Sequence, residues 1–275
     1  MLQALLLGLV EGLTEFLPVS STGHLTIVEK LLGLPIDDAG ITAFTAIVQI
    51  GAIAAVLVYF SVDIARLAHG WLTGLVSPAA RAEHEWRFGW YVIAGSLPIG
   101  IVGFAGRSLV ADARNLWIVA AGLIGWSAVM VVAEKVATHA RDETRVRLPD
   151  AVWIGLAQCV ALIPGVSRSG ATISAGLLRD LDRVAATRLS FFLAIPAMTA
   201  AAGFEALDAA HAIATGIGWA TTAIATTVAF AVAYASIAWL LKYVSHHKIS
   251  AFVWYRLAAG TLLATALAAG WVTAT

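Results

Sequence analysis

Two glutamates lie four residues apart in an apolar stretch that carries no other charge over residues 5–17. On a helix, this spacing puts the carboxylates of Glu11 and Glu15 on one face, about 6 Å apart. Two unpaired anions in apolar surroundings are costly, so either one carboxyl is protonated or a cation lies between them. A hard divalent ion such as Mg²⁺, bound by carboxylate oxygens and a substrate phosphate, fits the pattern. The alternative is a helix end at a membrane interface, where water solvates both carboxylates.

A polar loop and a histidine follow directly. The loop begins after Pro18 and contains Ser20, Ser21, Thr22 and Gly23. Hydroxyls and free backbone amides ahead of a new helix make a concave site for an anion. His24 then stands at the start of the next helix, where it can act as a base, a nucleophile or a general acid. A purely structural histidine is the alternative, but the neighbouring hydroxyls and carboxylates favour a site.

Arg168 lies in a second interrupted apolar segment, between Ser167 and Ser169. A guanidinium at membrane depth needs an anion, and its planar donor fork suits phosphate. The nearby residues that allow close backbone approach or add a hydroxyl are Gly165, Gly170 and Thr172. The alternative is that Arg168 is a structural counter-ion of Glu11 or Glu15.

The composition identifies the kind of protein that holds these residues. Of the 275 residues, 60% are hydrophobic and 12% are charged, and the mean hydropathy is +0.86. A soluble domain carries about 25% charged residues, so this chain lacks the charge to cover a water-facing surface. The composition excludes a disordered chain, a nucleic-acid binder with a basic face and most soluble enzymes of this size. Cys159, the only cysteine, excludes an internal disulfide and a thiolate metal cluster.

Six apolar stretches are long enough, at about 1.5 Å per residue, to cross a hydrocarbon core about 30 Å thick. They cover residues 41–60, 88–106, 115–133, 185–204, 217–241 and 251–272. The sequence therefore predicts an all-α polytopic membrane protein with six transmembrane helices, folded as a single integral membrane domain over residues 1–275.

Two further apolar segments are too short to span a membrane and are interrupted by the polar residues described above. The first covers residues 2–17 and resumes at 25–34, and the second covers 151–163 and resumes at 171–178. Irregular backbone within a membrane survives only where it lines a protein cavity. Because the flanks are apolar all round, we expect two re-entrant helix–loop–helix segments rather than surface loops between amphipathic helices.

The two interrupted segments are related to each other. A shift of 147 residues aligns five identical residues, and each segment is followed by three predicted spans. The identical residues are Gly8, Leu9, Val19, Ser20 and Gly23, which fall on Gly155, Leu156, Val166, Ser167 and Gly170. An odd number of crossings reverses orientation, so halves of about 1–140 and 141–275 are expected to form an inverted-topology repeat.

The basic residues are distributed unevenly about the predicted spans. One side carries 12 Lys and Arg, whereas the other carries only Lys30, Arg107 and Arg114. The loops of the richer side are 61–87, 134–150, 179–188 and 242–248. The positive-inside rule makes that side cytoplasmic. The interrupted segments then enter from opposite sides, so their polar tips can meet near the midplane, where paired-repeat transporters place their sites.

Both motifs closely resemble those of a known family. Residues 11–24, Glu-Gly-Leu-Thr-Glu-Phe-Leu-Pro-Val-Ser-Ser-Thr-Gly-His, look like the glutamate-rich motif and first loop of the bacterial undecaprenyl-diphosphate phosphatases, also called bacitracin-resistance proteins. Residues 164–172, Pro-Gly-Val-Ser-Arg-Ser-Gly-Ala-Thr, look like their second motif. The resemblance extends over essentially the whole chain in length, number of spans and motif spacing.

The resemblance implies a metal-dependent hydrolase of the bacterial inner membrane. Such an enzyme converts undecaprenyl diphosphate to undecaprenyl phosphate and phosphate, which recycles the lipid carrier for peptidoglycan synthesis and confers resistance to bacitracin. The implied partners are the polyprenyl diphosphate substrate and membrane lipid, with no nucleic acid, and a homodimer is left open.

By matching position, the resemblance assigns roles to the motif residues. Glu11 and Glu15 would hold a divalent cation, Mg²⁺ or Ca²⁺, and would position water or substrate. Catalysis would also use Ser21, His24 and Arg168, with the nucleophile left open between Ser21, His24 and water. The substrate-binding residues would be Ser20, Thr22, Gly23, Ser167, Ser169, Gly170 and Thr172. Phosphoryl transfer needs a cation, a placed nucleophile and a proton donor, and these residues supply all three.

Two other functions compete with this one. Type-2 phosphatidic-acid phosphatases have a Pro-Ser-Gly-His motif that resembles residues 18–24, but their third motif would require histidine at the position of Ser174. The non-enzyme alternative is a polyprenyl-phosphate transporter or flippase, because inverted repeats with opposed re-entrant loops are common in alternating access.

Overall fold

The computed structural model describes residues 1–36, 38–106, 113–215 and 217–275, and over these residues the regular elements are helices. Six of the described helices are long and apolar enough to cross a membrane. They are α3 (Ala39–Tyr59), α5 (His84–Ala105), α7 (Leu116–Val136), α10 (Arg183–Thr215), α11 (Trp219–Val244) and α12 (Ala251–Ala268). Each predicted span coincides with one of them, which confirms the all-helical architecture with six candidate spans.

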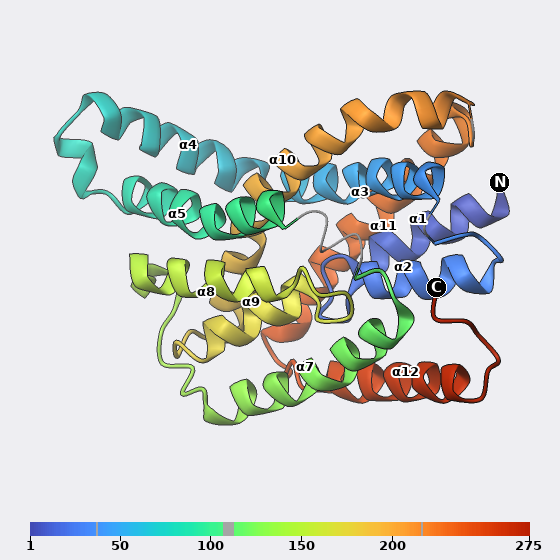
Figure 1. The fold of residues 1–275 in the computed structure, drawn as a ribbon. Helices are drawn as coiled ribbons and strands as arrows, with labels where there is room; N and C mark the ends of the chain where they lie inside the picture. The colour runs from blue at the N-terminus through green and yellow to red at the C-terminus, as the bar shows by residue number, and fades with distance from the viewer. Residues whose placement is uncertain (37, 107–112, 216) are drawn as a thin grey trace.

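The segment 61–87, predicted as a loop, is largely helical. Its elements are α4 (Ser61–Val76), a 3₁₀ turn (Ala79–Ala82) and the first turn of α5. Figure 1 shows α4 and α5 as a hairpin at the edge of the molecule. The ring of Trp71 lies against those of Trp86 and Trp90, with centroids 6.3 and 5.5 Å away. These contacts bury apolar surface between the two helices, and this packing explains why the segment is not a loop.

α10 is longer than predicted, and one of the counted basic residues lies outside the described part of the chain. α10 continues to Thr215, beyond the predicted end at residue 204, because the added stretch is rich in alanine, the strongest helix former. Arg107, counted among the basic residues of the sparse side, lies outside the described residues.

The two interrupted segments form two pairs of short helices. They are α1 (Leu2–Thr14) with α2 (Ser21–Leu31), and α8 (Leu148–Val160) with α9 (Arg168–Leu177). In Figure 1, α1 and α8 run toward the middle of the molecule from opposite ends, and α2 and α9 run back. We call residues 15–20 the first loop and residues 161–167 the second loop.

Both returning helices begin earlier than predicted. α2 begins at Ser21 rather than at residue 25, and α9 begins at Arg168 rather than at residue 171. The reason is a serine cap before each helix: the Ser20 hydroxyl accepts from the Gly23 amide, and the Ser167 hydroxyl accepts from the Gly170 amide. Much of each polar motif therefore lies in the first helical turn.

Glycines let the short helices approach the long ones closely. A Cβ at Gly8 of α1 would lie 2.4 Å from the carbonyl oxygen of Ala225 in α11. In the other half, a Cβ at Gly155 of α8 would lie 2.0 Å from the carbonyl oxygen of Gly95 in α5. Side chains at these positions would force the helices apart, so the sequence needs glycine there.

Aromatic side chains pack beneath the first loop. Phe16 meets Phe191 edge to face, with ring centroids 5.2 Å apart, and Phe191 lies 6.0 Å from Phe60. Phe192 continues the cluster against Phe60 and Phe88, at 5.2 and 5.6 Å. All five rings are almost completely buried. They give the polar loops a dry floor, where electrostatic interactions are stronger than in water.

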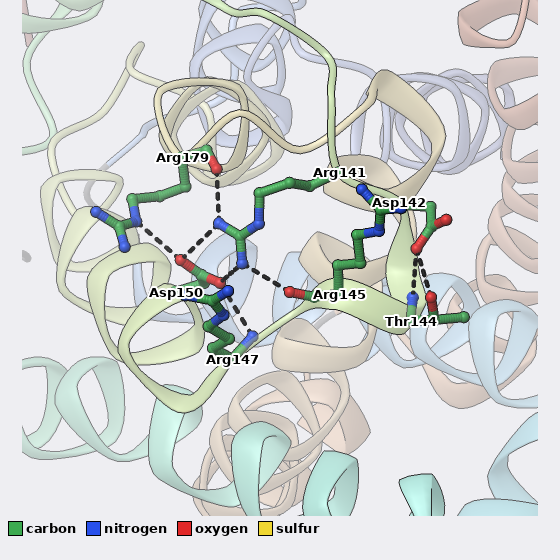
Figure 2. A network of polar contacts seen from close by, with 7 residues as sticks. All are labelled: Arg141, Asp142, Thr144, Arg145, Arg147, Asp150 and Arg179. Atoms are coloured by element: carbon green, nitrogen blue, oxygen red, sulfur yellow. Dashed lines mark hydrogen bonds and ion pairs between the residues drawn. The ribbon is translucent and has the colours of Figure 1, made fainter.

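A polar network closes the base of the α8–α9 pair (Figure 2). The buried carboxylate of Asp150, in the first turn of α8, accepts from the Arg141 guanidinium, from Arg179 Nε at 2.8 Å and from the Arg147 amide at 3.0 Å. Burial acts to raise the pKa of Asp150, but the hydrogen bonds from Arg141 and Arg179 outweigh it and hold that pKa below its ordinary value. The network ties the start of α8 to the end of α9.

Gly155→Ala is expected to destabilise the protein by about 1–3 kcal/mol, because the new methyl group overlaps the Gly95 carbonyl. Thermal unfolding in detergent measures the change. Gly125→Ala is the matched control, since a Cβ at Gly125 on α7 meets nothing within 4 Å. That control should be neutral or slightly stabilising, because alanine is the better helix former. Equal losses in both variants would contradict the close approach of α8 and α5.

Candidate active site

The first and second loops lie against each other in the middle of the molecule, and hydrogen bonds join them directly. The amide of Gly165 donates to the Ser20 hydroxyl at 3.2 Å. In the opposite direction, the Ser169 hydroxyl donates to the carbonyl oxygen of Leu17 at 2.9 Å. Two motifs that are more than 140 residues apart in sequence therefore form one polar cluster.

Glu15 is the centre of this cluster. One of its carboxylate oxygens accepts from the Ser21 hydroxyl at 2.5 Å, and the other accepts from Arg168 Nη2 at 2.9 Å. The carboxylate is buried, and the guanidinium is 15% exposed. The structure thus places the cation of the second motif and a hydroxyl within hydrogen-bond distance of the anion of the first motif.

Two polar atoms next to this ion pair have no partner. Glu11 is 1% exposed, and its Oε1 is buried without a hydrogen bond. Nη1 of Arg168 is likewise buried and unpaired. A buried polar group without a partner carries a large desolvation penalty, so these atoms favour a bound polar ligand. The free Nη1 also means that the pair with Glu15 leaves Arg168 able to bind a second anion.

The carboxylates fit a divalent cation that shares its shell with a ligand. Among the described residues, no group of three or more His, Cys, Asp or Glu side chains could hold a metal by itself. Mg²⁺, however, is often bound by one or two carboxylates together with substrate phosphates. Glu11 and Glu15 provide that number of ligands, and the free Glu11 Oε1 is an available oxygen.

The serine caps hold an unusual backbone conformation. Ser20 has φ of 77° and Ser167 has φ of 78°, a left-handed region that costs energy for any residue other than glycine. The amides of Ser21 and Thr22, and those of Arg168 and Ser169, lie ahead of the capped ones and have no partner within the helix. Two helix N-termini thus converge on the cluster, which favours an anion.

His24 contacts both the first loop and α12. Its Nδ1 lies 2.7 Å from the carbonyl oxygen of Ser20, and a carbonyl only accepts, so Nδ1 carries the proton. Nε2 then accepts from the Tyr255 hydroxyl at 2.6 Å, and the two rings stack. Both residues border a cavity of about 360 Å³ between α2 and α12, whose other walls are almost entirely apolar.

The remaining motif residues differ in how they relate to the cluster. Gly23 and Gly170 lie beside the caps, where a Cβ would be 3.2 Å from the Ser20 hydroxyl and from Ser167 Cβ, respectively. Thr22 is exposed. Thr172 is fully buried, and its hydroxyl donates to the Arg168 carbonyl and pairs with Ser190. It therefore supports the backbone of Arg168 rather than pointing at the carboxylates.

Two residues of the cluster were not anticipated from the sequence, Tyr255 and Arg256 of α12. The guanidinium of Arg256 is fully buried and donates to carbonyl oxygens of both loops. A signal was present: an arginine within an apolar membrane span is by itself a functional candidate. Hydropathy alone predicts a span over residues 251–272 and does not mark Arg256, its one cation, as part of the site.

Comparison with known proteins assigns relatives to the chain. The family profile described as "Bacitracin resistance protein BacA" matches residues 4–262. The chain is 57% identical to undecaprenyl-diphosphatase 3 of Frankia casuarinae, over all of this chain and 99% of that protein. It is 53% identical to an undecaprenyl-diphosphatase of Acidothermus cellulolyticus, over 98% and 97% of the two chains. It is 46% identical to one from Nocardioides, over 99% and 98%.

Ser167→Ala is expected to destabilise the protein more than Ser167→Gly. Both changes remove the cap, but only glycine adopts the positive φ of this position without strain. We expect a difference of about 1 kcal/mol, measured as a shift in thermal unfolding. Ser245→Ala, at an exposed helix end, is the control and should change little. An alanine variant as stable as the glycine variant would contradict the strained cap.

Proposed function

The chain belongs to the family of the bacitracin resistance protein BacA, and we propose that it is the phosphatase that hydrolyses undecaprenyl diphosphate to undecaprenyl phosphate and phosphate. It is a multi-pass protein of the bacterial membrane, with six candidate spans. The observation that carries the assignment to this site is the contact of Glu15 with both Ser21 and Arg168. A hydroxyl, a base and a phosphate-binding cation then surround one position.

Ser21 is the nucleophile in this proposal. Its hydroxyl already donates to Glu15, so the carboxylate can take the proton as the oxygen attacks the terminal phosphorus. The new bond is Ser21 Oγ–P, the bridging P–O bond breaks, and undecaprenyl phosphate leaves. Glu15 gives the proton from Ser21 to the departing undecaprenyl phosphate and is again a carboxylate. Water then attacks the phosphoserine, Glu15 takes a proton from that water, and phosphate leaves as Glu15 returns this proton to the serine oxygen. His24 is less suited to attack, because Ser20 and Tyr255 occupy both of its nitrogens.

Arg168 and the two helix N-termini bind the phosphate groups. The unpaired Nη1 of Arg168 offers a donor, and the free amides at the starts of α2 and α9 offer more. These groups are fixed before substrate arrives, so they stabilise the charge that develops on the phosphoryl oxygens without reorganisation. The apolar cavity bordered by His24 and Tyr255 suits the isoprenoid chain next to the diphosphate.

Glu11 and Glu15 are the residues that would hold a divalent cation, Mg²⁺ or Ca²⁺. The support is the donor set itself, two buried carboxylates on one helix face with one free oxygen on Glu11. When bound there, such an ion would neutralise charge on the diphosphate. The protein's own part is to keep both carboxylates buried at the end of α1, beside Arg168 of α9.

The two interrupted segments are proposed to be re-entrant and related as an inverted repeat. The start of α1 meets the end of α2 through Gln3 and the Leu32 carbonyl, and Asp150 and Arg179 likewise close the α8–α9 pair. The caps Ser20 and Ser167 share the same φ and the same bond to a glycine three residues on. α1 packs on α11 as α8 packs on α5, each through an aligned glycine. The homodimer stays a prediction.

The transporter alternative is not favoured, because the curated relatives are named as diphosphatases. An inverted repeat is common in transporters, but a nucleophile and base in hydrogen-bond contact serve no purpose in simple transport.

Arg168→Lys is expected to lower kcat for phosphate release from a C15 isoprenyl diphosphate by about 100-fold, because one ammonium cannot contact Glu15 and phosphate as the guanidinium fork does. Glu15→Gln should lose at least as much. Both are measured on purified protein in detergent with Mg²⁺.

Arg114→Lys is the matched control, because Arg114 also pairs with a buried glutamate, Glu29, at 3.3 Å. It should keep turnover within about twofold of the unchanged protein. Near-normal turnover in Arg168→Lys would make Arg168 a structural counter-ion and remove it from the mechanism.

Re-entrance predicts that both ends of the α1–α2 pair face outward. In a Cys159→Ser background, Gln3→Cys and Leu31→Cys, two exposed positions, should react with a membrane-impermeant maleimide in intact spheroplasts. Ser245→Cys, on the basic side, should react only after lysis. Labelling of only one of the two outer positions before lysis would mean that the pair crosses the membrane.

A further inference from the structure

Arg256 lies in the second turn of α12 and has no carboxylate partner. None of the ion pairs among the described residues includes it, although its side chain is completely buried. A buried guanidinium without a counter-ion is costly unless its donors are satisfied. Arg256 satisfies them with oxygens that carry no formal charge. The number and the placement of these hydrogen bonds therefore decide whether the cost of burying the guanidinium is offset.

The acceptors of Arg256 belong to three separate parts of the chain. Nη1 donates to the Pro18 carbonyl of the first loop at 3.0 Å. Nη2 lies within 3.0 to 3.1 Å of the carbonyl oxygens of Gly165 and Val166 in the second loop, and also contacts that of Gly122 in α7 at 3.1 Å. Nε contacts the Ser127 hydroxyl at 3.3 Å. One rigid, planar group thus spans both loops and the helix beneath them.

The two loop contacts come directly before the two strained caps. Pro18 is two residues before Ser20, and Val166 is one residue before Ser167. Because these carbonyls are held, each loop enters its positive-φ turn at a fixed place. This also fixes where α2 begins, at Ser21, and where α9 begins, at Arg168. The neighbouring residue of α12, Tyr255, contacts His24 in the first turn of α2.

We propose that Arg256 is a positioning residue for the hydrolysis: it binds carbonyl oxygens of both loops, and so aligns Ser21 and Glu15 of the first half with Arg168 of the second. This inference rests on the proposed function. Arg256 itself does not touch the reacting atoms. Its planar fork reaches Pro18 and Gly165 at once, whereas the single ammonium of lysine cannot reach both.

Arg256→Lys and Arg256→Gln test the proposal, with Ser127→Ala as control. The control removes the contact to Nε and leaves both loop contacts in place. Steady-state kinetics on a C15 isoprenyl diphosphate, and thermal unfolding of the same preparations, are measured in detergent. We expect kcat to fall about 100-fold in the Arg256 variants, since small misplacements of reacting groups have effects of this size. KM should change less than threefold, and Ser127→Ala should keep normal kcat.

A double-mutant cycle separates positioning from a general loss of structure. If Arg256 acts by aligning Arg168, then Arg256→Lys should reduce kcat much less in the Arg168→Lys background than alone. Independent effects that multiply would overturn the proposal. So would a loss of activity that follows the folded fraction, or failure of both Arg256 variants to fold, since each would assign Arg256 to fold stability. Absence of turnover in the unchanged protein would instead reject the proposed function.

Discussion

Two loops that are largely buried in the middle of an apolar molecule set the main physical constraint on this protein. The carbonyls and amides of their buried parts cannot reach bulk water, so each needs a partner within the protein. The partners include the Ser20 hydroxyl and the Arg256 guanidinium, which join one loop to the other, and the Ser169 hydroxyl, which joins the start of α9 to the first loop. The hydrogen bonds that satisfy the backbone are therefore the same ones that bring the two motifs together.

The chemistry of the site follows from the opposite charges that meet where the two motifs contact each other. The first half of the chain contributes the carboxylates and the serine, and the second contributes Arg168. The aromatic floor around Phe16 keeps the pair in a medium of low polarity, where fixed charges and dipoles act strongly. In the proposed function a diphosphate headgroup would bind here, since it offers oxygens to the guanidinium, to the helix amides and to a cation held by the carboxylates.

The two halves share a backbone design but differ in the side chains that carry chemistry. Ser20 and Ser167 form matching caps, yet Glu11 aligns with Gln158, whose buried amide has no hydrogen-bond partner. Ser21 aligns with Arg168 in the same way. Two matching serine caps therefore stand beside side chains of different chemistry, which the proposed phosphoryl transfer requires, since nucleophile and phosphate-binding cation must differ.

Hydropathy and spacing determined the six spans, the two interrupted segments and most of the candidate residues, because these are local properties of the chain. They did not reveal that residues 61–76 form a helix, which depends on tryptophan contacts with α5, or that the Thr172 hydroxyl is engaged with Ser190. Arg256 shows the limit most clearly. Every residue carries a carbonyl, so no sequence pattern marks the few that a buried guanidinium binds; only the tertiary packing of α12 against both loops selects them.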